Sequence, residues 1–364
     1  MKRTNMISRR SFLQAALAAS ALALAGCGGS ASSSAASSAA PAASPAASSS
    51  AAPAGGQTFK VGIVNYVDDA SLNQIVASVE SRLDAVGAEK GVTFNYKDYY
   101  SNAQADQSNL NQIGADLVAD GVDVIVAVAT PTASTMLAAV EDTDIPVVYS
   151  AVSDPVGAGF DGEPNMTGTS DALDTTAIMN LIVAANPDLD KLGLLYDLGQ
   201  DSSTQAIADA QAFCAEKGME VIEKNGTTTA EVQMAAEALI AAGVKAVFTP
   251  TDNTIMTAEL AIYEEFIEAG VQHFTGADSF ALNGAFLGYG VDYVQLGEAT
   301  ADMVVEILCD GKTPADLPFR TFDNGIATVN TETCEALGLD FATLKEAFAP
   351  YCTSVAEITT AEEF

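Results

Sequence analysis

Two stretches of the sequence, VAVATPTASTM (residues 126–136) and KAVFTPTDNTIM (residues 245–256), are two versions of one pattern. Each is a short apolar run that ends in Thr-Pro-Thr and leads into a helical stretch, as a β-strand leads into an α-helix in an α/β protein. Around them the helical stretches that end in AEKG at 88–91 and at 215–218 match as well. A repeated α/β series predicts two similar three-layer lobes, each with a parallel sheet covered by helices.

The order of the predicted elements indicates that the chain crosses between the lobes more than once. After the second series come a further helical stretch at 293–312 and a further strand at 319–329. Several crossings predict a hinge, and the carboxyl ends of the strands of both lobes then face one ligand cleft. We expect the N-terminal lobe to comprise residues 59–164 and about 291–312, and the C-terminal lobe to comprise 165–290 and about 313–350.

Residues 1–26 have the pattern of an export signal. A basic start with Arg9-Arg10, typical of the twin-arginine route, precedes an apolar run, 12–25, that is shorter than the roughly 20 residues of a membrane span. The segment LAGC, ending at Cys27, resembles a bacterial lipobox, in which the cysteine is lipidated and becomes the new N-terminus. Residues 27–58 are mostly Ala, Ser, Pro and Gly, which predicts a disordered tether. We therefore expect an exported lipoprotein on the outer face of the cytoplasmic membrane, by the twin-arginine or the Sec route.

Charge and rare residues exclude several classes of function. The chain has 15 Lys and Arg against 48 Asp and Glu, and removal of the signal leaves 11 basic residues, for a net charge of −37. So acidic a protein is not expected to bind nucleic acid. One histidine, His273, excludes a histidine-rich metal site, and no nucleophile–base constellation is evident. We expect no enzyme, cofactor or metal; the disulfide pairing of four further cysteines stays open: Cys214, Cys309, Cys334 and Cys352.

Hydroxyl, amide and carboxylate side chains gather at the predicted strand ends. Hydroxyls and N–H groups at helix N-termini suit a carboxylate, and a carboxylate such as Asp252 suits an ammonium group. Asp252 is the expected ammonium partner because the first copy of the repeat has Ala133 at that position, so the shared fold alone does not explain an acid there. The same residue types are ordinary helix caps, so a structural role is the alternative for each. The predicted ligand-binding residues are Asp69, Ser71, Thr130, Thr132, Ser153 and Asp154 in the first lobe and Asp201, Ser202, Ser203, Thr251, Asp252, Asn253 and Asp278 in the second.

With the lipobox and the tether, four segments carry a family resemblance: IPVVYSAVSDPVGAG (145–159), NMTGTSD (165–171), TPTDNT (249–254) and NTETCEALGLDF (330–341). The chain resembles the substrate-binding lipoproteins of ABC importers, more narrowly those whose members bind tryptophan, tyrosine or phenylalanine. The resemblance implies a type I periplasmic-binding-protein fold and an amino acid, aromatic in those members, delivered to an ABC permease and its ATPase. It departs at YDLGQDSSTQ (196–205), which lacks the expected Asn-Ser pair. The alternative is a ligand-sensing receptor of the same fold that signals to a membrane partner.

Overall fold

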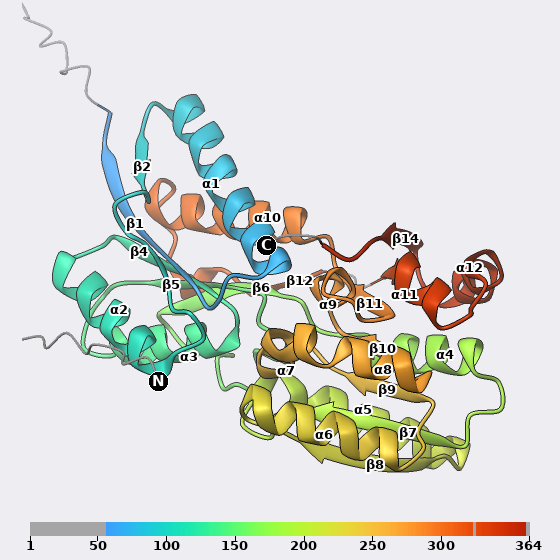
Figure 1. Ribbon diagram of the computed structural model, residues 1–364. Coiled ribbons are helices and arrows are strands. Elements are labelled where there is room, and N and C mark those ends of the chain that lie inside the picture. The colour runs from blue at the N-terminus through green and yellow to red at the C-terminus, as the bar shows by residue number, and fades with distance from the viewer. Residues whose placement is uncertain (1–55, 323–324, 362–364) are drawn as a thin grey trace, which may run out of the picture. The chain divides into compact units, whose positions relative to one another are not determined.

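Two seven-stranded β-sheets organise the protein in the computed structural model, which describes residues 56–322 and 325–361 (Figure 1). Helices cover both sheets, and the prediction of two α/β lobes is confirmed. Cys27, the predicted signal peptide and nearly all of the predicted tether lie outside the described residues. No helix of the described residues is long and apolar enough to cross a membrane.

The first sheet is parallel throughout. Its main order is β12-β6-β5-β4-β1-β2, and β3 also pairs with β1. The strands are β1 (Thr58–Asn65), β2 (Thr93–Asn95), β3 (Tyr100–Asn102), β4 (Val124–Val128), β5 (Val147–Ser150), β6 (Met166–Ser170) and β12 (Arg320–Thr321). Its helices are α1 (Ala70–Lys90), α2 (Gln107–Asp120), α3 (Thr130–Ala139) and α10 (Tyr293–Leu308).

The second sheet has the order β14-β13-β11-β10-β9-β7-β8 and one antiparallel pair, β11 with β13. Its strands are β7 (Lys191–Tyr196), β8 (Glu220–Asn225), β9 (Ala246–Thr249), β10 (Gln272–Thr275), β11 (Leu287–Gly290), β13 (Ile326–Asn330) and β14 (Ser354–Ile358). Its helices are α4 (Thr175–Ala185), α5 (Asp201–Lys217), α6 (Thr229–Ala241), α7 (Asn253–Ala258), α8 (Tyr263–Ala269), α9 (Asp278–Leu282), α11 (Thr331–Ala336) and α12 (Phe341–Phe348). Short 3-10 helices are η1 (Glu259–Ala261), η2 (Pro314–Asp316) and η3 (Ala349–Tyr351).

The chain passes between the two sheets three times, after β6, after β11 and after β12. The sheets divide the chain differently from the expected lobe limits. Strand β6 pairs with β5, so the first sheet continues to Ser170 instead of ending near residue 164. The single strand expected at 319–329 is two strands, β12 in the first sheet and β13 in the second. The repeated AEKG segments both end helices, because Gly91 and Gly218 take the left-handed conformation at φ 69°.

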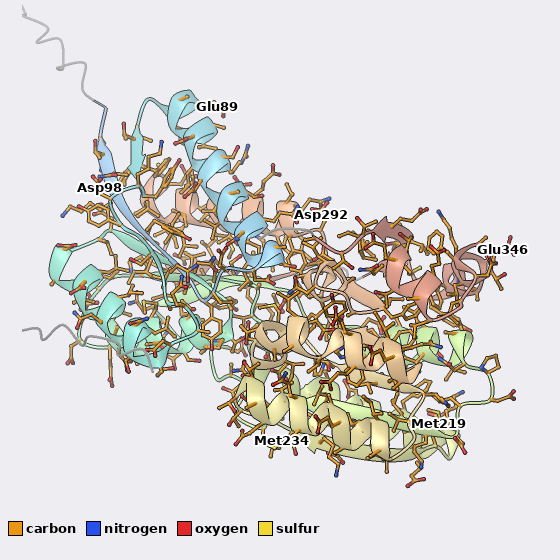
Figure 2. The ribbon with its side chains drawn as sticks, viewed as in Figure 1. Glu89, Asp98, Met219, Met234, Asp292 and Glu346 are labelled. Atoms are coloured by element: carbon orange, nitrogen blue, oxygen red, sulfur yellow. The ribbon has the colours of Figure 1, made fainter. Side chains whose placement is uncertain are left out.

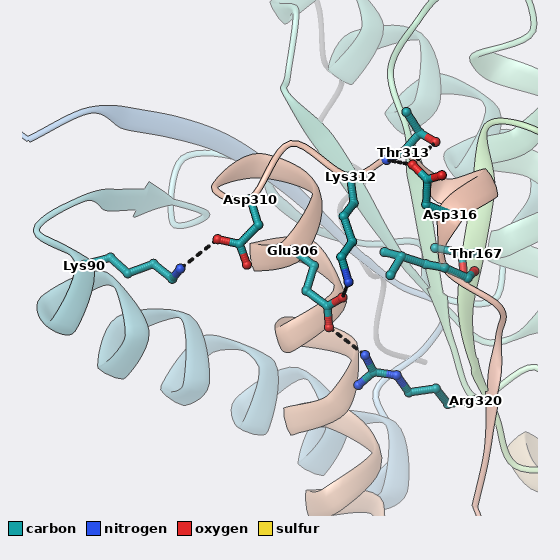
Figure 3. Close-up of polar contacts among 9 residues, drawn as sticks. Lys90, Thr167, Glu306, Asp310, Lys312, Thr313, Asp316 and Arg320 are labelled. Atoms are coloured by element: carbon teal, nitrogen blue, oxygen red, sulfur yellow. Dashed lines mark hydrogen bonds and ion pairs between the residues drawn. The ribbon is translucent and has the colours of Figure 1, made fainter.

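Packing of α10 against α1 attaches the returning chain to the first lobe. A Cβ atom at Gly297 would lie 2.7 Å from the Ile75 carbonyl oxygen, so only glycine permits this approach. The segment after α10 is held by ion pairs of Glu306, 2.6 Å from Lys312 Nζ and 2.7 Å from Arg320 Nη2 (Figure 3). These contacts stabilise the segment that connects α10 to β12.

The buried histidine of the second lobe has structural partners. The His273 side chain is buried between Glu259 Oε1, 3.0 Å from Nδ1, and Thr249 Oγ1, 2.8 Å from Nε2, as expected for a core histidine. All four cysteines of the described residues are free thiols, and burial raises the pKa of Cys214 to about 11. Acidic side chains such as Glu89 and Glu346 lie exposed on the helices (Figure 2).

Candidate ligand-binding site

A cavity of about 20 Å³ lies between the two lobes, beyond the carboxyl ends of their strands. It has room for about one water molecule, so a larger ligand requires movement of the lobes or of the lining side chains. A groove of 1030 Å³ in the first lobe is much larger, but it adjoins the amino ends of β4, β5 and β6. The cavity is lined by Asp69, Ser71, Leu72, Ala129, Thr130, Ala151, Ser153, Asp171 and Tyr293 with Ser202, Thr251, Asn253, Met256 and Ala277.

On one side of the cavity, helices α3 and α5 begin without a side-chain cap. Helices α8 and α9 also begin without a side-chain cap, whereas the other eight α-helices of the described residues (α1, α2, α4, α6, α7, α10, α11 and α12) are each capped by a side chain. The hydroxyls of Thr130 and Ser202, in the first turns of α3 and α5, are buried and have no hydrogen-bond partner among the described residues. Uncapped N–H groups and unpartnered hydroxyls at helix N-termini form a site for an anionic group such as a carboxylate.

On the other side, buried carboxylates line the cavity. Burial raises the pKa of Asp171 to about 6, although Ser153 Oγ donates to it at 3.0 Å. Burial likewise raises the pKa of Asp69 to about 6, against the hydrogen bonds from Leu72 and Ser71. Tyr293 lies beside these groups; burial above all, and then Asp171, Asp278 and Asp69, raises its pKa. The described residues that line the cavity include no Lys or Arg, and burial desolvates both carboxylates.

Backbone conformation around the cavity is unusual as well. Among the described residues, four other than glycine have positive φ, and two of them, Ala129 (76°) and Ala151 (55°), line the cavity. Such conformations are energetically unfavourable and are concentrated at functional sites.

The family model for ABC transporter substrate-binding proteins matches residues 60–354. The chain belongs to this family. It is accordingly a solute-binding protein of an ABC transporter and not an enzyme, and such proteins typically act outside the cytoplasm.

Several relatives are known by their ligands or conformations. A tyrosine-binding protein of Clostridioides difficile (strain R20291) is 28% identical over 284 residues, which cover 77% of this chain and 81% of the relative. A Streptococcus pneumonia structure in complex with L-Trp is 26% identical, with a TM-score of 0.74 over 82% of this chain and all of the other. A ligand-free, open binding protein from Clostridium difficile, also 26% identical, has a TM-score of 0.61 over 83% of this chain and all of the other. The arrangement here is thus nearer to the L-Trp complex than to the open structure.

Seven of the predicted ligand-binding residues of this substrate-binding protein line the cavity: Asp69, Ser71, Thr130, Ser153, Ser202, Thr251 and Asn253. The other six lie elsewhere. Thr132 is buried within α3, and Asp154 accepts a hydrogen bond from Gly157 N in its own loop. Asp201 lines a neighbouring pocket, and Ser203 donates to Asp252. Asp278 accepts a hydrogen bond of 2.6 Å from Ser71 Oγ, which connects the second lobe to the first.

Asp252, expected to contact an ammonium group, has a different environment. It is the N-cap of α7, where its Oδ1 accepts from Thr254 N and Ile255 N. Its Oδ2 accepts from Asp197 N at 2.8 Å and from Ser203 Oγ at 2.7 Å. Both carboxylate oxygens of Asp252 already accept hydrogen bonds, and Asp252 does not line the cavity. Asp252 is therefore a helix cap, which is the alternative role considered for it above.

Seven of the lining residues are not among the predicted ligand-binding residues, and Asp171, Tyr293 and Met256 are three of them. Asp171 directly follows β6, whose sequence MTGTS has too few apolar residues to be recognised as a strand. Its position at the end of the NMTGTSD segment was the available signal.

Proposed function

We propose that this binding protein captures an α-amino acid in the cavity between its lobes. The observation that supports this best is the opposite character of the two sides, an uncapped helix pair with unpartnered hydroxyls facing two desolvated carboxylates. A zwitterion complements both sides at once. The tyrosine-binding and L-Trp-bound relatives support an amino acid ligand, and an aromatic one.

In this proposal the ligand carboxylate accepts from the Thr130 and Ser202 hydroxyls and the adjoining helix N–H groups. The ammonium group donates to Asp171 and Asp69. A buried cation without a carboxylate partner is costly, and burial also desolvates the carboxylates of Asp69 and Asp171. Ligand and protein therefore lower each other's desolvation cost. We assign the ammonium contact to Asp171, in place of Asp252.

Closure of the lobes would complete the site. The hydrogen bond from Ser71 Oγ to Asp278 joins α1 to α9 across the cavity and is available only when the lobes meet. A ligand that contacts both lobes favours the closed form through those contacts. The closed, loaded protein would then deliver the amino acid to an ABC permease and its ATPase, and a lipid on Cys27 would hold it at the outer face of the membrane.

Identification of the co-purifying small molecule by mass spectrometry, followed by calorimetric titration, tests the proposal. L-Phenylalanine is compared with phenethylamine, which lacks the carboxylate, and with 3-phenylpropionate, which lacks the ammonium group. We expect each analogue to bind at least thirtyfold more weakly than the amino acid, because each leaves one charged side of the site unpaired. Absence of binding by every amino acid, or binding of either analogue within threefold of the amino acid, would contradict the proposal.

A further inference from the structure

A second pocket adjoins the carboxylate side of the cavity. This lateral pocket has a volume of about 220 Å³, roughly ten times that of the cavity. Apolar walls come from Val67, Ala70, Met256 and Leu260, and Leu260 is 52% exposed, unusual for a leucine. Its lining is completed by Asp68, Asp69, Thr257 and Asn283.

Two residues, Asp69 and Met256, line both the cavity and the lateral pocket and therefore lie between them. Asp69 is fixed as the N-cap of α1, where it accepts from Ser71 N at 2.9 Å and Leu72 N at 3.2 Å. Met256 is held more weakly, by a contact of 3.5 Å between its Sδ and Ser279 Oγ. A methionine side chain has three rotatable bonds and adapts to its surroundings, so Met256 is the movable part of the wall.

At the lateral pocket, Asn283 carries an acceptor that is not used. Its Oδ1 is buried and accepts no hydrogen bond from the described residues. A buried acceptor is stabilised by any donor that reaches it. A ligand side chain that enters this pocket and ends in an O–H or N–H group would supply that donor.

We propose that Met256 controls the passage of the ligand side chain from the cavity into the lateral pocket, where Asn283 accepts a hydrogen bond from its far end. This inference rests on the proposed amino acid function: an ammonium group at Asp69 places the α-carbon beside Met256. The opening at the other side of the cavity is lined by polar Gln107, Asn111 and Gln200 and suits an apolar ring less well. The favoured ligand is an aromatic amino acid with a terminal donor, such as tyrosine, over phenylalanine.

Calorimetric titrations of tyrosine, phenylalanine and alanine into the full mature protein test the two residues separately. We expect the parent to bind tyrosine about tenfold more tightly than phenylalanine, the net effect of one hydrogen bond. Asn283→Leu, similar in shape, should remove that preference by weakening tyrosine while phenylalanine is unchanged. Met256→Ile, stiff at χ1, should weaken tyrosine and phenylalanine at least tenfold but leave alanine unchanged. Met234→Ile is the control, because Met234 lies exposed on α6 (Figure 2).

Thermal unfolding of each variant separates lost folding from lost binding. Any of three results would overturn this inference and leave the proposed function intact. The parent could bind tyrosine and phenylalanine equally, Asn283→Leu could affect the binding of tyrosine and phenylalanine equally, or Met256→Ile could affect the binding of tyrosine and alanine equally. Absence of binding by any amino acid to the parent would overturn both.

Discussion

Asp171→Asn should change ligand affinity and protein stability in opposite directions. The substitution keeps the shape of the side chain and one oxygen that can accept from Ser153 Oγ, which lies 3.0 Å from Asp171 Oδ1 in the parent, but it removes the negative charge. In the complex the ligand ammonium loses its main partner in a buried site. In the ligand-free protein the same change removes a carboxylate that is desolvated at neutral pH.

Both magnitudes follow from these environments. Truncation of a buried charge pair costs about 2 to 5 kcal/mol, which corresponds to a loss of affinity of roughly thirtyfold to several thousandfold. The folded protein holds the pKa of Asp171 at about 6, against an ordinary value of 3.8. Keeping this group ionised at pH 7 therefore costs on the order of 2–3 kcal/mol, and the ligand-free variant should be more stable by up to that amount.

Calorimetric titration with the best-binding amino acid measures the affinity, and chemical unfolding of the ligand-free protein measures the stability. Asp252→Asn is the matched control, since burial raises the pKa of Asp252 to about 6 as well but its oxygens cap α7 and accept from Asp197 N and Ser203. In the control the loss of acceptors costs about 1–3 kcal/mol and opposes the relief of desolvation, so it should gain less stability than Asp171→Asn and have little direct effect on binding. A loss of affinity below threefold for Asp171→Asn, or a larger loss for the control, would refute the assignment.

Three further predictions concern pH, closure and anchoring. Between pH 7 and pH 5 the ligand affinity should fall about tenfold or more as Asp69 and Asp171, whose pKa values burial raises to about 6, become protonated. The unfolding free energy of the ligand-free protein should rise over the same range, because stability from a raised pKa is fully present below pH 3.8 and lost above pH 6. An affinity independent of pH would contradict this prediction. Ser71→Ala removes the hydrogen bond to Asp278, so the ligand-free radius of gyration in small-angle scattering should increase and affinity should fall about threefold to tenfold, whereas unchanged scattering would argue against this bond as a closing contact. Cys27→Ser should move the protein from the washed membrane pellet to the aqueous fraction with its ligand affinity intact; an uncleaved variant that stays in the pellet would count against lipidation.

The architecture could be predicted because its signals are local. Apolar runs such as VIVAV in β4 are buried along their whole length, and helix ends such as Gly91 and Gly218 use a conformation that glycine favours. Strands that combine polar and apolar residues lack this local pattern. MTGTS in β6 was missed, and with it the position of Asp171 at the first crossing between the lobes.

The repeated Thr-Pro-Thr segments show what only the tertiary structure decided. In the first copy α3 begins at Thr130, without a side-chain cap, and the Thr130 hydroxyl borders the cavity with no partner in the part of the chain that the structure describes. In the second copy β9 continues through Thr249, α7 begins at Asn253, and Asp252 is the helix cap. Capping a helix and binding a ligand use the same donors and acceptors, so residue type and spacing predicted polar groups at the strand ends but not their partners. Their partners depend on where each helix begins and on which side chains the packing of the two lobes brings together.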